Sequence, residues 1–272
     1  MDPLVTMMAA ADATERLRVL SLVLSNDNRH PALVHKAVAT IDVLSGGRAE
    51  LGLGAGWLAD DYAALGLPRD RPAIRISRLE ESVRLLKRLF EAKAPFDFEG
   101  AHYRGRGLEG LPPPAQHPRP PLLIGGGGKR MLSLAAREAD IVGVNASLGA
   151  SASRATQITG LTAEEAEEKV RWVAESMTDT GRPAEDVELQ VSVLELHLTD
   201  SPAAARRVLE SLADASGLDP KSVAESPAVL IGSLDHCAEL LQGRRQRFGF
   251  SYIKLGPDAF AAAPLVSRLA GT

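Results

Sequence analysis

Short apolar runs alternate with amphipathic helical patterns along most of this chain. Six runs have the length and the leucine, isoleucine and valine content of buried strands. They lie near residues 20, 51, 123, 142, 192 and 253. Helical spacing follows them at 31–44, 74–90, 131–138, 162–177, 202–213 and 234–248. This order favours a parallel sheet with right-handed helical crossovers over a sandwich or a helix bundle.

A closed barrel of alternating strands and helices has eight strands, two more than these six. Three alternatives stay open. Two strands escape the pattern, the sheet is open, or the chain begins after a strand, helix, strand and helix that a full barrel would have. A length of 272 residues suits one barrel domain.

The composition excludes several classes of protein. The net charge is −4, with 31 basic and 35 acidic residues spread evenly, so we expect neither nucleic-acid nor membrane-surface binding. No apolar run is long enough to span a bilayer. A single cysteine, Cys237, excludes an internal disulfide framework and suits a buried structural thiol. Met1-Asp2-Pro3 lacks the features of a signal peptide, so we expect a cytoplasmic protein.

Residues 45–57 hold a turn, a short strand and a glycine-rich exit. Gly54 and Gly56 leave the end of that strand without side chains, which commonly lets a phosphate or a flat ring approach the backbone. The competing interpretation is a plain tight turn. Trp57 is either a stacking wall for a ring or a core aromatic residue.

Four glycines, Gly125 to Gly128, separate another buried strand from a helix. Backbone N–H groups at the start of a helix bind anions, and Lys129 and Arg130 add two cations there. We therefore expect a phosphate site, against the alternative of a merely flexible connection. The segment is not a nucleotide P-loop, because Leu123 and Arg130 occupy the places of its first glycine and of its Ser or Thr.

Other motifs are weak. The segment from Gly54 loosely matches a dinucleotide fingerprint, but we expect a loop that contains Pro68 after Trp57, and this loop delays the helix that the fingerprint needs at once. The candidate ribose ligands Glu80 and Glu81 fall inside a helix whose charged face we expect to be solvated. The histidine spacing supports no metal site, and no serine nucleophile elbow occurs. His30, before Pro31, suits the orientation of a loop at a strand end.

Taken together, these motifs resemble the bacterial luciferase-like monooxygenase superfamily, and within it the branch that uses the deazaflavin coenzyme F420. The resemblance rests on LSGGRAELGLGAGW at 44–57 with the following Asp61-Tyr62, on Leu20 to Pro31, on PPLLIGGGGKR, and on Ile231-Gly232-Ser233 with the last strand. It covers nearly the whole chain. It implies a (β/α)8 TIM-barrel type of α/β fold, here a single domain over 1–272 that lacks the first two strand and helix units.

The resemblance also implies where the cofactor binds. Its ring would lie over the carboxyl ends of the strands, and a non-proline cis peptide bond would match Ser25-Asn26. A histidine that often ends the family's second strand is absent from this chain, so no catalytic residue is assigned. The predicted cofactor ligands are Ser25, Asn26, Asp27, Gly54, Ala55, Gly56 and Trp57 at the ring, and Gly126, Gly127, Gly128, Lys129 and Arg130 at the phosphate.

The implied function is that of an oxidoreductase that transfers a hydride between F420 and an unknown small organic substrate. One alternative is an FMN-dependent monooxygenase of the same superfamily. Another is an inactive partner subunit that holds a cofactor. The resemblance further implies a homodimer. The loop at 145–160 is small and polar, which suggests mobility and offers no indication of the substrate.

Overall fold

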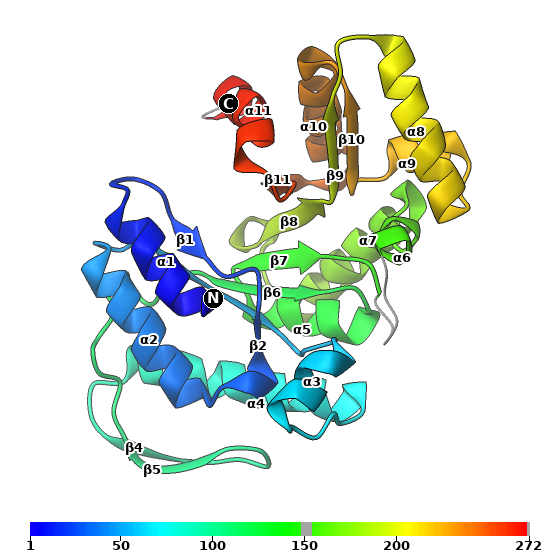
Figure 1. Ribbon diagram of the computed structural model, residues 1–272. Coiled ribbons are helices and arrows are strands. Elements are labelled where there is room, and N and C mark those ends of the chain that lie inside the picture. Colours follow the sequence, from blue (N-terminus) through cyan, green and yellow to red (C-terminus); the bar gives the residue numbers. More distant parts are fainter. Residues whose placement is uncertain (148–153, 271–272) are drawn as a thin grey trace. The chain divides into compact units, whose positions relative to one another are not determined.

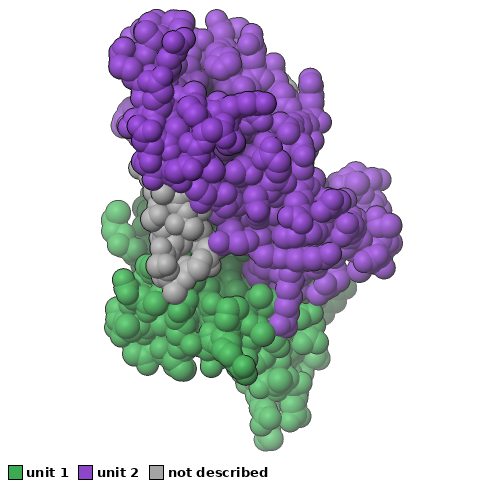
Figure 2. All heavy atoms as spheres, turned by 90° about the vertical axis from the view of Figure 1, so that its right-hand side faces the viewer, with its two compact units in different colours: residues 1–125, 138–140 green, residues 126–137, 141–272 purple. Residues whose placement is uncertain are grey.

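Two compact units make up the computed structural model, which describes residues 1–147 and 154–270 (Figures 1 and 2). The first unit comprises residues 1–125 and 138–140, and the second comprises residues 126–137 and 141–272. The division falls within one strand, β6 (Leu122–Gly126). The single domain stays a prediction, and the two units are described in turn.

The first unit combines four helices with short strands. In chain order its elements are α1 (Pro3–Asp12), β1 (Val19–Leu20), β2 (Leu24–Ser25), the 3-10 turn η1 (Asn26–Asn28), α2 (Pro31–Leu44), β3 (Ala49–Gly54), α3 (Ala59–Leu65), α4 (Pro72–Glu91), β4 (Phe96–Glu99), β5 (Arg104–Leu108) and most of β6.

Strand β3 is the centre of this unit. All six of its residues are buried, and β1, β2 and β6 each pair with it in parallel. Leu51 is aligned with Leu122 of β6, and Gly54 is aligned with Ser25 of β2. Because all these strands run in the same direction, the segments that follow β2 and β3 emerge at the same end of the sheet.

The second unit repeats the pattern of strand and helix. Its elements are α5 (Lys129–Glu138, whose last residue belongs to the first unit), β7 (Ile141–Val144), α6 (Arg154–Thr159), α7 (Ala163–Thr180), the 3-10 turn η2 (Ala184–Asp186), β8 (Glu188–Val193), β9 (Glu195–Leu198), α8 (Pro202–Ser216), α9 (Pro220–Glu225), β10 (Val229–Gly232), α10 (Leu234–Phe248), β11 (Phe250–Leu255) and α11 (Ala259–Leu269).

Parallel pairing also organises the second unit. β8 pairs with β7 on one side and with β11 on the other, and β9 pairs with β10. The strand expected near residue 192 is therefore two strands that meet at Leu194, because its two halves pair with different partners. Cys237 is buried in the core of this unit, as predicted.

Helix boundaries follow local signals in the sequence. Ser233 caps α10 by accepting a hydrogen bond from the His236 N–H, and Gly249 ends the helix at φ 79°. Pro31 occupies the first position of α2, where the missing N–H costs nothing, and the His30 ring accepts the N–H of Ala32. This confirms the structural interpretation of His30.

The six predicted strands are all present, as β1 with β2, β3, β6, β7, β8 and β11. The predicted loop after Trp57 is wrong, since residues 59–65 form α3. The predicted loop at 145–160 lies partly outside the described residues, and residues 154–159 form α6 rather than loop. Within the described ranges, no helix has the length and apolar character needed to cross a membrane.

Candidate functional site

In the first unit, the structure brings together two of the predicted groups of cofactor ligands. Ser25 is aligned with Gly54 in the parallel pair of β2 and β3. Asn26 and Asp27 follow Ser25 in the turn η1, while residues 55–57 leave β3 beside them. The carboxyl ends of parallel strands are the usual place for ligands in α/β proteins.

The last glycine of β3 and the glycine two residues after the strand accommodate neighbouring chain segments. A Cβ atom at Gly54 would lie 2.8 Å from Cγ2 of Val23. One at Gly56 would lie 2.2 Å from the Tyr62 hydroxyl oxygen and 2.8 Å from the Ser25 hydroxyl oxygen. A side chain at either position would therefore displace the protein's own atoms. Approach of a ligand to this backbone stays a prediction.

Asp27 is the centre of a buried polar network. Its Oδ2 atom accepts a hydrogen bond from the Tyr62 hydroxyl at 2.9 Å and lies 2.9 Å from a guanidinium nitrogen of Arg78. Only 4% of the Asp27 side chain is exposed. Arg78 also pairs with Asp70, which joins this network to the loop before α4. The adjacent Asn26 donates a hydrogen bond to the Tyr103 hydroxyl at 3.0 Å.

The protonation states in this network follow from burial and hydrogen bonding. Burial raises the pKa of the Tyr62 hydroxyl, and its hydrogen bond to Asp27 raises it further, so the phenol is neutral at physiological pH. Burial opposes the charge of Arg78, but hydrogen bonds to Asp70 and Asp27 outweigh it and raise the pKa of that guanidinium. The network therefore places Asp27 between a neutral phenol and a permanent cation.

Arg75 orders the segment that follows β3. Its guanidinium donates to the carbonyl oxygens of Ala55 and Gly56, and the group lies 5.9 Å from the centre of the Tyr62 ring. Arg75 is 5% exposed. The expectation of a solvated charged face on α4 is wrong at this position, because the arginine folds inward to bind carbonyl groups that β3 leaves unpaired.

Trp57 is 40% exposed, which excludes the interpretation of a core aromatic residue in this unit. Arg69 binds its backbone carbonyl oxygen at 3.0 Å. The backbone of Trp57 is thus tethered while its indole ring stays accessible. This arrangement suits the alternative interpretation, a wall for a flat ring.

Three polar atoms of this cluster are buried and have no hydrogen-bond partner among the described residues. They are Oγ of Ser25, Oδ1 of Asp27 and Nε of Arg75. Buried polar groups are nearly always paired, so such atoms mark a place where a ligand or water is needed. Together they offer a hydroxyl, a carboxylate acceptor and a cationic donor, which suits the polar edge of a heterocycle.

In the second unit, the glycine-rich turn leads directly into α5. Gly126 still belongs to β6, so the loop is shorter than four glycines. A Cβ atom at Gly127 would lie 2.2 Å from the Ala146 carbonyl oxygen, whereas one at Gly128 would meet nothing within 4 Å. Gly128, Lys129 and Arg130 are exposed at the first turn of the helix. The N-terminus of a helix and two cations are the elements of an anion site, although Lys129 is also paired with Glu175 at 3.4 Å.

Glu81, one of the candidate ribose ligands, has a structural role. Its buried carboxylate accepts hydrogen bonds from the N–H groups of Ala101, His102 and Tyr103 at 2.9, 2.9 and 2.6 Å. Burial raises the pKa of this carboxyl, but the three N–H groups outweigh burial and lower it. The carboxylate therefore anchors the turn between β4 and β5 onto α4, which leaves the dinucleotide interpretation without this ligand.

The expected cis peptide bond is not at Ser25-Asn26. The cis bond in this region joins Leu22 and Val23, between β1 and β2. Ser25 instead has an extended backbone and precedes the 3-10 turn that carries Asn26 and Asp27. Among the described residues, no group of three or more histidine, cysteine, aspartate or glutamate side chains is placed to hold a metal ion.

The assignment of Ser25, Asn26 and Asp27 to the cofactor ring stays a prediction, and the sequence did not indicate the roles of Arg75 and Arg78 beside them. Two arginines three positions apart in the first turns of α4 were the available signal. On sequence alone this pair looks like any solvated helix face.

Residues 1–251 match the family described as "Luciferase-like monooxygenase". A curated relative is the FMNH(2)-dependent dimethylsulfone monooxygenase of Pseudomonas putida, 34% identical over 128 residues, which are 47% of this chain and 35% of that enzyme. The matched region thus spans about a third of this relative's length.

Solved structures share the fold. The monooxygenase RslO1 from Streptomyces bottropensis superposes with a TM-score of 0.75 at 23% identity, over 98% of this chain and 80% of that chain. An F420-dependent secondary alcohol dehydrogenase in complex with an F420-acetone adduct gives a TM-score of 0.79 at 15% identity, over 99% and 83%. These likenesses confirm the predicted α/β fold class of barrel type. The chain belongs to the luciferase-like monooxygenase family.

Proposed function

We propose that this protein is an oxidoreductase that transfers a hydride between coenzyme F420 and a small organic substrate. The observation that carries the proposal is the set of unpaired buried atoms on Ser25, Asp27 and Arg75, at the ends of β2 and β3. A deazaflavin or flavin ring has a polar edge with both N–H and carbonyl groups, and these three atoms could pair with it. An F420-dependent dehydrogenase is also among the proteins of the same fold.

The cofactor supplies the hydride chemistry when it is bound, and the chain binds and orients it. Asp27 would accept a hydrogen bond from the ring edge, with its charge held in place by Tyr62 and Arg78. The exposed ring of Trp57 would cover a face of the cofactor. In the second unit, the turn at Gly126, Gly127 and Gly128, with Lys129 and Arg130, would bind phosphate.

An FMN-dependent monooxygenase is the second candidate. The FMNH(2)-dependent relative from Pseudomonas putida favours it, since that match has the higher sequence identity. The polar edge of FMN offers the same kinds of hydrogen-bonding groups, so the cluster around Asp27 does not separate the two cofactors. Oxygen consumption distinguishes the two candidates, because a flavin monooxygenase consumes oxygen and an F420-dependent dehydrogenase does not.

The first test is titration of F420 and of FMN with the purified protein, followed by their fluorescence. We expect saturable binding of F420, and at least tenfold weaker binding by Asp27→Asn, which keeps the shape of the side chain and removes its charge. Asp60→Asn is the control, because Asp60 is an exposed residue on the same short helix as Tyr62.

A lack of any fluorescence change with both cofactors would refute the proposal. Saturable binding of FMN alone, with oxygen uptake on addition of reduced FMN, would establish the second candidate instead. Binding without turnover of any alcohol or ketone would favour a partner subunit that only holds the cofactor. Sedimentation velocity on the same samples tests the predicted homodimer.

A further inference from the structure

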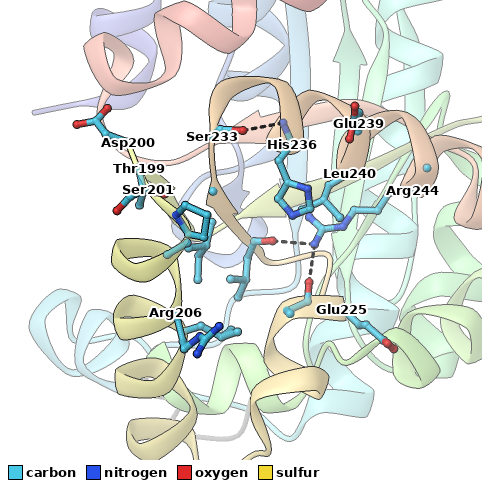
Figure 3. Close-up of a pocket in the computed structure, with 18 of the residues that line it drawn as sticks. Thr199, Asp200, Ser201, Arg206, Glu225, Ser233, His236, Glu239, Leu240 and Arg244 are labelled. Carbon is cyan, nitrogen blue, oxygen red and sulfur yellow. Dashed lines mark hydrogen bonds between the residues drawn. The ribbon is translucent and has the colours of Figure 1, made fainter.

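A groove of about 930 Å³ lies entirely within the second unit, between α8 and α10 (Figure 3). Strand β10 forms its floor, and α9 contributes to one end. Its α10 wall runs from His236 to Phe248, about 18 Å at the rise of a helix. The apolar part of the lining includes Leu209, Val229, Ile231, Leu240 and Phe248.

Gly243 keeps the middle of this groove open. It lies inside α10, a helix of 15 residues, where glycine is the least favourable residue apart from proline. Apart from its two chain neighbours and the backbone of its own helix, no atom of the described chain lies within 4 Å of the position that its Cβ would take. Packing within the chain therefore does not require glycine there. A ligand that lies along the helix would require a residue no larger than alanine there.

The charges of the lining balance each other. The guanidinium group of Arg244 already binds the protein itself, because it donates hydrogen bonds to the carbonyl oxygens of Ser226 and Val229 at 2.8 Å. Arg247 is paired with Glu167 of α7. The groove thus gives an ionic ligand no net attraction. The charged lining residues are Asp200, Glu225 and Glu239 against Arg206, Arg244 and Arg247, with His236 beside them.

One end of the groove is polar. Thr199 and Ser201 lie together just before α8, and Ser233 lies apart from them, beside His236 at the start of α10 (Figure 3). Ser201 and Ser233 accept the N–H groups of Ala204 and His236, which leaves each hydroxyl hydrogen free to be donated. Oγ1 of Thr199 is buried and has no partner among the described residues. These groups suit an uncharged oxygen on a ligand.

We propose that this groove binds an elongated, uncharged molecule with an apolar chain and a hydroxyl or carbonyl group at one end. The chain lies over β10 and past Gly243, and the oxygen meets the hydroxyl groups of Thr199 and Ser201. The volume is that of a typical small-molecule site, and such sites are mostly apolar with a few polar groups. The inference does not depend on the cofactor proposal, since none of the residues proposed to bind cofactor lines this groove.

The test uses the neutral fluorescent probe N-phenyl-1-naphthylamine with the full chain. We expect saturable binding at one site, and displacement by 1-decanol at concentrations at least tenfold lower than those of decanoate or decyltrimethylammonium. Gly243→Leu fills the groove and should weaken probe binding at least tenfold. Gly243→Ala adds only a methyl group and should stay within about threefold of the wild type.

Gln242→Leu is the matched control, because Gln242 is exposed on α10 and does not line the groove. Circular dichroism melting of each variant verifies that it is folded. The proposal is overturned if Gly243→Leu binds the probe like the wild type, or if Gln242→Leu loses binding equally. Preferential displacement by either ion would overturn the uncharged ligand. A dimer that excludes the probe and that Gly243→Leu dissociates would show that a second copy fills the groove.

Discussion

The hydroxyl group of Tyr62 donates a hydrogen bond to the carboxylate of Asp27 across 2.9 Å, and thereby ties α3 to the turn after β2. The two residues are far apart in sequence, and both are buried around this bond. A hydrogen bond to a charged acceptor contributes about 1.5–3 kcal/mol, whereas one between neutral groups contributes about 1 kcal/mol. The difference can be measured with a matched pair of variants.

We expect Tyr62→Phe to lower the free energy of unfolding by about 2 kcal/mol. Tyr103→Phe, which loses the neutral bond with Asn26, should cost about 1 kcal/mol. Urea denaturation monitored by circular dichroism measures both values. Equal losses in the two variants would show that the charge of Asp27 adds nothing to the bond.

His35 should make stability depend on pH. The residue is 1% exposed, its ring lies 4.7 Å from that of Phe90, and burial lowers its pKa to about 4. Its pKa in the unfolded chain is about 6.5, so the unfolded state binds the extra proton between these two values. The stability that follows from the neutral state of His35 is therefore fully present above pH 6.5. It is lost as the pH falls towards 4, by up to about 3 kcal/mol.

The check is urea denaturation between pH 4 and pH 8 for wild type and His35→Leu. The variant should show a flatter dependence over this range. His117→Gln, at an exposed histidine, should keep the slope of the wild type. An unchanged slope in His35→Leu would mean that another group controls stability in this range.

Removal of the Glu81 carboxylate should be among the most damaging changes on α4. Glu81→Ala leaves three backbone N–H groups of the β4–β5 turn without their acceptor, and we expect a loss of about 3 kcal/mol or more. Glu91→Ala, at an exposed residue of the same helix, should change stability by less than about 0.5 kcal/mol. Hydrogen exchange should speed up at Ala101, His102 and Tyr103 in the first variant only.

Two adjacent glycines should respond differently to alanine. At Gly127 the added methyl group would meet the Ala146 carbonyl oxygen at 2.2 Å, so Gly127→Ala should destabilise the second unit by about 1–3 kcal/mol. At Gly128 the methyl group would enter open space, and Gly128→Ala should be nearly neutral. Thermal melting compares the two. If both variants melt like the wild type, the turn does not pack as tightly as this distance implies.

The strands could be predicted from sequence because burial on both faces of a parallel sheet leaves continuous apolar runs. Helix α10 was also predictable to its ends, since Ser233 and Gly249 supply both caps. The apolar pattern does not predict the short helix α3, although Asp60 in its first turn and Gly66 just after its end are signals of a helix. It does not predict α1 either, although Asp2 and Pro3 stand at its start.

The candidate site was only half predictable. Ser25, Asn26 and Asp27 follow a strand, and position after a strand is a local property of the chain. Arg75 and Arg78 lie on a helix, where a charged residue gives no sign of whether it faces solvent or folds inward. That choice depends on the unpaired carbonyl groups of Ala55 and Gly56 and on the Asp27 carboxylate, which only the folded unit brings within reach.

The close packing of β3 against residues 21–25 also limits how this protein can change over time. Val23 occupies the space that a side chain at Gly54 would need, and Tyr62 does the same at Gly56. A larger residue at Gly54 can be accepted only together with a smaller one at its neighbour. At Gly56 the backbone φ of 73° disfavours any side chain, so glycine should persist there whatever residue stands at position 62. Across related sequences, Gly54 and Val23 should therefore vary jointly, so that their substitution histories record this contact without any structure.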